Sequence, residues 1–138
     1  MTYRFGLRSK ASLLGVHPDL IAVAYRALQL STVDFTVTEG LRSVARQHKL
    51  FAENKSQTLN SRHITGHAID VVALKAGEVT WDWAAYEQLA VAFKAAATEL
   101  DVDLEWGGDW KSFKDGMHFQ LSHASYPAPR DAAAGEQA

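Results

Sequence analysis

The fold and the chemistry of this chain both depend on one stretch, Ser61-Arg62-His63-Ile64-Thr65-Gly66-His67-Ala68-Ile69-Asp70. A second segment with candidate site residues follows later in the sequence, Asp115-Gly116-Met117-His118-Phe119-Gln120. Together they offer three metal ligands, namely His63, Asp70 and His118. Three nitrogen or oxygen ligands with a fourth position left for water are the ligand set of a catalytic zinc site. Asp115 then remains free to accept or donate a proton.

The residues around these candidates predict two strands. Ile69-Asp70-Val71-Val72-Ala73-Leu74 has the β-branched and apolar composition of a largely buried strand. A carboxylate inside such a run costs several kcal/mol unless it is paired or bound to a cation, so Asp70 needs a partner. In Met117-His118-Phe119-Gln120-Leu121, period-two alternation places His118 and Gln120 on one face and the apolar residues on the other. We therefore expect His118 to point away from the apolar face and toward Asp70.

A different metal site is conceivable, in which His63 and His67 form a pair four residues apart on a helix, as in His-Glu-x-x-His zinc peptidases. The sequence argues against this helix, because Gly66 lies between the two histidines and Thr65 is a poor helix former. No glutamate follows His63 either. His67 is better interpreted as a neighbour of the site, and its contact with substrate or metal is left open.

The pattern His63-x-x-Gly66-x-Ala68-x-Asp70, then Trp106-Gly107-Gly108-Asp109-Trp110 and Asp115-x-x-His118-Phe119, resembles that of zinc peptidases acting on the peptide part of bacterial peptidoglycan. That family contains the L-alanyl-D-glutamate endopeptidases of bacteriophage endolysins together with D-alanyl-D-alanine carboxypeptidases and dipeptidases. The resemblance runs from about Phe35 to Leu121, and motif order, spacing and flanking strands all agree.

The resemblance implies a role for each matching residue. His63, Asp70 and His118 would bind Zn²⁺, and Asp115 would be the catalytic base. Arg42 matches an arginine that the family places beside the substrate carbonyl. Ser61 matches a position that often contacts substrate, although a serine there can equally cap the turn. An aspartate at position 115 is familiar from phage endopeptidases and some carboxypeptidases, whereas enzymes that release D-alanyl dipeptides commonly carry glutamate.

Length and composition set broad limits. At 138 residues and 15.2 kDa the chain has the size of one domain, and we expect a single catalytic domain over residues 1–125 with a flexible C-terminal tail over 126–138. The formal charge of −2 provides no basic field for nucleic acid. The absence of cysteine excludes disulfides, thiolate metal sites and a cysteine nucleophile.

The predicted fold class is α+β, with about three helices packed against a small, mainly antiparallel sheet that carries the zinc site. Helices are expected over 18–30, from Ser43 to about 54–57, and along the stripe that runs from Tyr86 to Leu100. The other expected strands are 34–39, 79–81 and 103–106.

The N-terminal residues have no apolar core of signal-peptide length, and no segment approaches the ~18 apolar residues that span a bilayer. We therefore expect a protein made in a host cytoplasm, without stable membrane association, that reaches the cell wall through a membrane lesion. Its partner would be the peptidoglycan peptide, and we expect it to act as a monomer.

Three functions compete for this sequence. The first is a zinc endopeptidase that cleaves the L-alanyl-D-glutamate bond. A D-alanyl-D-alanine carboxypeptidase would need a cationic pocket for a free carboxylate, and Arg62, Lys111 and Lys114 can serve either substrate. A non-catalytic module that binds a wall peptide or a protein is the third, and the presence of Asp115 counts against it, because such a module needs no base.

Overall fold

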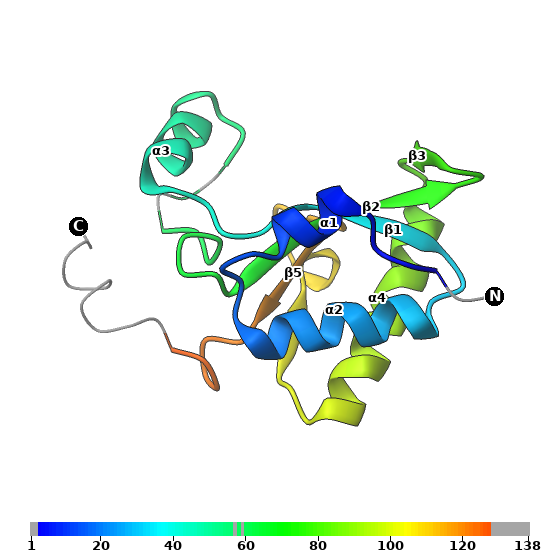
Figure 1. Ribbon diagram of the computed structural model, residues 1–138. Helices are drawn as coiled ribbons and strands as arrows, with labels where there is room; N and C mark the ends of the chain where they lie inside the picture. The colour runs from blue at the N-terminus through cyan, green and yellow to red at the C-terminus, as the bar shows by residue number, and fades with distance from the viewer. Residues whose placement is uncertain (1–2, 57, 59, 128–138) are drawn as a thin grey trace.

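The computed structural model describes residues 3–56, 58 and 60–127, and it has the predicted α+β architecture around an antiparallel sheet (Figure 1). The strand order is β1-β2-β5-β4, and β3 pairs with the C-terminal residues of β2. Every strand pair is antiparallel. The strands are β1 (Asp34–Glu39), β2 (Ala68–Lys75), β3 (Glu78–Thr80), β4 (Leu104–Trp106) and β5 (His118–Leu121).

Among the described residues, four α-helices accompany the sheet, namely α1 (Leu7–Ser12), α2 (Pro18–Leu30), α3 (Val44–Ala52) and α4 (Trp83–Leu100). A 3-10 turn, η1 (Gly107–Asp109), follows β4. The sequence predicted all of these α-helices except α1, whose six residues are too few to show helical periodicity. Within the described residues, none of the helices combines the length and the apolar composition needed to cross a membrane.

Local sequence sets where the helices begin. At α2, the Nδ1 atom of His17 accepts a hydrogen bond from the backbone N–H of Asp19, and Pro18 fills the first helical position, where its missing N–H costs nothing. At α3, the Oγ atom of Ser43 accepts from the backbone N–H of Arg46, as the sequence predicted. Helix α3 projects from the rest of the molecule at the upper left of Figure 1.

Alternation along β2 separates a core face from a second face, called the polar face below because it carries Asp70 of β2 together with His118 and Gln120 of β5. Ile69, Val71 and Ala73 are fully buried and belong to the hydrophobic core, which also includes residues of α2 and α4. On α4, Phe93 stacks on Phe119 of β5 with ring centroids 3.9 Å apart. Asp70 points the other way, because successive side chains on a strand alternate between faces. The core therefore fixes the face on which Asp70 lies.

The register of β2 and β5 aligns the polar residues of that second face. Asp70 is paired with His118, and Ala68 is paired with Gln120. This confirms the expectation that His118 points toward Asp70. A shift by one residue would send both side chains into the core, since the side-chain period is two.

Phe93→Ala should lower the free energy of unfolding by about 3–5 kcal/mol, because it removes a fully buried ring and leaves a cavity against Phe119. Chemical denaturation monitored by circular dichroism measures the change. Val91→Ala is the matched control on the same helix, since Val91 is 70% exposed and its loss should cost less than about 0.5 kcal/mol. Equal destabilisation by the two substitutions would contradict the assignment of Phe93 to the core.

Candidate metal centre

His63, Asp70 and His118 come together on the polar face of the sheet. One ligand atom from each lies within 4.8 Å of the others. The Oδ1 atom of Asp70 is 3.3 Å from Nε2 of His63 and 3.2 Å from Nδ1 of His118. Both histidines are buried, whereas Asp70 keeps part of its surface exposed. The three residues that the sequence nominated therefore form one compact, partly accessible group.

Hydrogen bonds on the outer nitrogens orient both imidazoles. Nδ1 of His63 lies 2.8 Å from the carbonyl oxygen of Gly40, so it carries a proton and leaves the lone pair on Nε2. That Nε2 atom is buried and has no hydrogen-bond partner within the described part of the chain, although Asp70 is nearby. A buried nitrogen without a partner is unfavourable. A cation between His63, Asp70 and His118 would satisfy it, so these residues fit a metal.

The charges of this group are strongly coupled. Burial raises the pKa of Asp70, but the hydrogen bond with His118 and the adjacent His63 outweigh it and hold this pKa well below its usual range. Burial lowers the pKa of His118, but Asp70 and then Gln120 outweigh it and the net pKa is raised. The imidazole of His118, beside the Asp70 carboxylate, therefore binds a proton more tightly than a free imidazole does. A metal ion takes the place of such a proton, which is why metal binding releases protons.

Asp115 lies in the turn that precedes β5. Its backbone oxygen accepts from the N–H of His118, and its Oδ1 atom accepts from the N–H of Met117 at 3.3 Å. Burial raises the pKa of Asp115, and the negative charge of Asp70 raises it further. A carboxyl group with a raised pKa beside candidate metal ligands is suited to proton transfer. The turn role and the acid–base role are compatible in this position.

Arg42 is buried behind the metal ligands. Its guanidinium makes a bidentate pair with Glu39, at 2.9 and 2.7 Å, and donates to Oε1 of Gln47 at 2.7 Å. One nitrogen also lies 3.5 Å from Oδ2 of Asp70. The contact that the structure gives Arg42 is thus to a candidate ligand, and its contact with a substrate carbonyl stays a prediction. Glu39 and Gln47 belong to no motif, so their contacts with Arg42 could not be predicted from the sequence.

Ser61 and Arg62 hold the loop that delivers His63. The Oγ atom of Ser61 accepts from the backbone N–H of His63 at 3.1 Å, which is the turn-capping role, so substrate contact by Ser61 stays a prediction. Arg62 is buried and donates to the backbone oxygens of Leu121, Ser122 and Tyr126. All three contacts are made by Nη2, whereas the buried Nε and Nη1 atoms have no hydrogen-bond partner among the described residues. The burial of Arg62 argues against a contact with a substrate carboxylate.

Two glycines permit close approaches at the site. A Cβ atom on Gly40 would lie 2.1 Å from the backbone oxygen of Ser12, so only glycine lets α1 approach the carbonyl that orients His63. A Cβ atom on Gly107 would lie 2.4 Å from the backbone oxygen of Asp115. The Gly107-Gly108 pair was visible in the sequence, but its purpose follows from these contacts alone.

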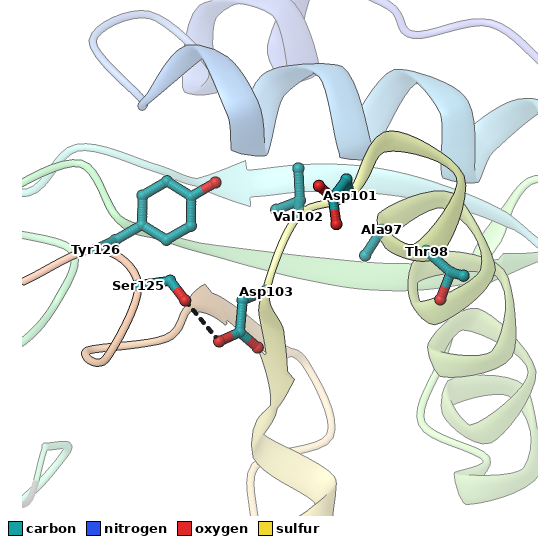
Figure 2. A pocket seen from close by; sticks show the side chains of 7 residues that line it. All are labelled: Ala97, Thr98, Asp101, Val102, Asp103, Ser125 and Tyr126. Carbon is teal, nitrogen blue, oxygen red and sulfur yellow. Dashed lines mark hydrogen bonds between the residues drawn. The ribbon is translucent and has the colours of Figure 1, made fainter.

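A cavity of about 640 Å³ lies at the C-terminal end of α4, apart from the candidate ligands (Figure 2). Two of its lining residues are joined by a hydrogen bond, in which the hydroxyl of Ser125 donates to Asp103 at 2.8 Å (Figure 2). The hydroxyl of Tyr126, the first residue of the predicted tail, donates to Asp19 at 2.7 Å. The rest of that predicted tail, from residue 128, lies outside the described residues. The cavity is lined by Ala97, Thr98, Asp101, Val102, Asp103, Ser125 and Tyr126.

Two histidines and an aspartate gathered at one face of a sheet, with a second carboxyl group beside them, are an arrangement typical of hydrolytic metalloenzymes. The family model "Phage L-alanyl-D-glutamate peptidase" matches residues 1–126. The chain belongs to this family of peptidases.

Individual relatives agree with the family. The L-alanyl-D-glutamate peptidase of Escherichia phage T5 is 37% identical over 130 residues, which cover 91% of this chain and 94% of that protein. The crystal structure of the Serratia marcescens L-Ala D-Glu endopeptidase ChiX is 56% identical, with a TM-score of 0.87 over 91% of this chain and 95% of that one. The vancomycin resistance D,D-dipeptidase VanXYg has a TM-score of 0.50 at 16% identity over 77% of this chain and 50% of that one, which shows a shared fold alone.

His67 lies beside the site without joining the ligand group. Its Nδ1 atom is 2.6 Å from Oγ1 of Thr65, and its ring lies 5.6 Å from that of His17. Burial lowers the pKa of His67 to about 4, and the positive charge of Arg62 contributes. His67 is therefore neutral in the folded protein near pH 6, where an unfolded histidine is partly protonated.

Because the unfolded chain binds this proton more tightly, stability should fall as the pH drops from about 6.5 toward 4. We expect His67→Asn to lose less thermal stability than the wild type between about pH 7 and pH 5. Melting temperatures at both pH values measure the difference. His48→Asn, at an exposed histidine of α3, is the control and should keep the wild-type slope. If the melting temperature of His67→Asn fell with pH as steeply as that of the wild type, His67 would not be the source of the pH dependence.

Proposed function

We propose that the protein is a zinc-dependent endopeptidase that hydrolyses the L-alanyl-D-glutamate bond of the peptidoglycan peptide. The observation that carries this proposal is the open group of His63, Asp70 and His118, in which a buried nitrogen of His63 has no hydrogen-bond partner among the residues that the structure describes. Membership of the phage L-alanyl-D-glutamate peptidase family supports the substrate. Two nitrogens and one carboxylate oxygen support zinc as the metal, because this donor set is common at catalytic zinc sites.

When bound, zinc would lower the pKa of a coordinated water to about 7 and polarise the scissile carbonyl. The residues of the chain supply the rest of the chemistry. The Asp115 carboxylate takes a proton from the attacking water and returns it to the nitrogen of the departing amine, so that the peptide bond is replaced by a carboxylic acid and an amine. Its raised pKa suits both transfers, since the group must gain and lose a proton near neutral pH.

Arg42 is proposed to contribute a positive charge near the developing oxyanion. A fixed cation stabilises that charge in the transition state. Its pairing with Glu39 and Gln47 supports this role by fixing the guanidinium in advance, and its 3.5 Å approach to Asp70 sets its distance from the ligands. Ser61 is proposed as a weaker contact to the substrate backbone.

The two competing functions have less support. A D,D-carboxypeptidase needs a cation for the terminal carboxylate. The buried Arg62 donates to backbone oxygens instead, whereas Lys111 and Lys114 are exposed and remain the candidates for that cation. A non-catalytic module has no need of Asp115. Both would also set this chain apart from its relatives that are named L-alanyl-D-glutamate peptidases.

We further propose that residues 1–125 form a single catalytic domain that works as a monomer on the wall peptide. The family match over residues 1–126 supports this extent. Access to the wall would follow release from the host cytoplasm through a membrane lesion.

His63→Ala, Asp70→Ala and His118→Ala should each lose bound zinc and most of the activity, because two ligands do not hold the ion in place. Zinc content by mass spectrometry and release of muropeptides, measured on the same preparation, test this. His48→Ala and His123→Ala are the controls, since both histidines are exposed and lie outside the ligand group. Stoichiometric zinc with normal turnover in any ligand variant would remove that residue from the site.

Asp115→Asn should keep zinc and the fold but lose about 10²- to 10⁴-fold in rate, because an amide cannot accept the proton of the water. Asparagine keeps an oxygen for the N–H of Met117, so the turn should survive. Bound zinc, melting temperature and wall-lytic rate together separate the two roles. A folded, zinc-replete variant with more than about a tenth of the wild-type rate would rule out Asp115 as the base.

The pH profile gives a second test of Asp115. A base works only when deprotonated, and the pKa of Asp115 is raised, so the wild-type rate should fall on the acid side at a higher pH than an ordinary aspartate would give. The residual rate of Asp115→Asn should lack this acid limb.

A further inference from the structure

Gln120 makes a hydrogen bond that the proposed chemistry does not use. Its Oε1 atom lies 2.8 Å from Nε2 of His118, on the side of the imidazole away from Asp70. Gln120 is buried, and its Nε2 atom donates to Oε1 of Glu105 at 3.2 Å. Asp70, His118, Gln120 and Glu105 thus form a continuous hydrogen-bonded chain across the polar face of three strands.

The sheet itself aligns this chain. Asp70 and His118 are paired between β2 and β5, and Gln120 and Glu105 are paired between β5 and β4. His118 and Gln120 are two residues apart on β5, so their side chains share one face. The residue of β2 that is paired with Gln120 is Ala68, whose side chain is a single methyl group.

Glu105 determines which way the amide of Gln120 faces. An ionised carboxylate can only accept hydrogen bonds, so it must face the NH₂ group of Gln120. The amide oxygen is then turned toward His118, and Nε2 of His118 must carry the proton that this oxygen accepts. The lone pair left for a metal is on Nδ1, which is the atom that faces Asp70.

We propose that Gln120 is the positioning residue of His118 and that Glu105 holds the Gln120 amide in the orientation this requires. The inference rests on the proposed metal site. Gln120 does for His118 what the Gly40 carbonyl does for His63, because each fixes the outer nitrogen as a donor. The amide also polarises the imidazole without placing a second full negative charge beside Asp70. Partners of this kind orient ligands, and their loss typically weakens metal affinity about 10- to 100-fold.

Three variants isolate the role of the amide. Gln120→Met keeps the length of the side chain but removes the acceptor. The exchange Gln120→Glu with Glu105→Gln moves the carboxylate beside His118 and keeps an acceptor there. Gln88→Met makes the same change at an exposed glutamine of α4 and is the matched control.

The zinc dissociation constant, measured by competition with a chromophoric chelator, should rise about 10- to 100-fold in Gln120→Met. The exchange variant should bind zinc at least as tightly as the wild type, because a charged acceptor strengthens the hydrogen bond. Gln88→Met should bind zinc normally. If Gln120 had a merely structural role, Gln120→Met and the exchange variant should weaken zinc binding alike, because both replace a buried side chain. Normal zinc affinity in the exchange variant alone is therefore the deciding result.

Spectroscopy provides a readout independent of activity. In the zinc-loaded wild type, nitrogen-15 NMR should show the proton of His118 on Nε2 and slow exchange of that proton with water. In Gln120→Met this proton should exchange rapidly with water, and the absorption bands of the cobalt-substituted variant should shift relative to those of the cobalt-substituted wild type.

A zinc dissociation constant of Gln120→Met within about threefold of the wild-type value would overturn the proposal, because that change is well below the expected increase of about 10- to 100-fold. If that variant does not fold, the exchange variant decides, and a folded exchange protein with about tenfold weaker zinc binding would also overturn it. A wild-type protein that binds no zinc would instead refute the proposed function and this inference with it. If the wild type binds zinc and is active, and Gln120→Met binds zinc as tightly as the wild type, the inference about Gln120 is refuted but the proposed function stands.

Discussion

The antiparallel pairing of β2 with β5 is the constraint on which the rest of the structure depends. It places Asp70 opposite His118 and, on the reverse face, Ile69 opposite Phe119. The apolar pair is locked by the core under α4, where Phe93 stacks on Phe119. Because a slip by one residue would exchange the two faces, the hydrophobic energy of the core also specifies the geometry of the polar group. Folding and site assembly are one event at this pair of strands.

A carboxylate at this position is tolerated because the neighbouring groups compensate its charge. Asp70 has a histidine near Oδ1 on each side and the guanidinium of Arg42 at 3.5 Å from Oδ2. Arg42 is balanced in turn by Glu39, and Glu39 also pairs with Arg46 at 2.8 Å. Buried charges that lose one partner are costly, so such an alternating arrangement is stable only when it is complete. Nε2 of His63, which has no hydrogen-bond partner in the described part of the chain, is the atom that a cation could satisfy.

The outer surroundings of the ligands come from parts of the chain that are far apart in sequence. Gly40 orients His63, Gln120 orients His118, and Gln47 holds Arg42 while its amide donates to Ser56. Each of these contacts uses an amide or a backbone carbonyl and adds no net charge. The group can therefore be held rigidly while its total charge stays suited to a divalent cation, and rigid positioning of ligands is a general requirement of metal sites.

The sequence by itself determined the strands, three of the four helices and the candidate ligands, since strand alternation, helical periodicity and motif spacing are local signals. It also placed His118 and Gln120 on one face of β5. Only the tertiary structure decided that Arg62 donates to backbone oxygens, that Tyr126 is anchored to Asp19, and that Gly40 and Glu105 support the ligands. These contacts join residues that are distant along the chain, and no local pattern records which amide meets which carboxylate until the sheet register brings them together.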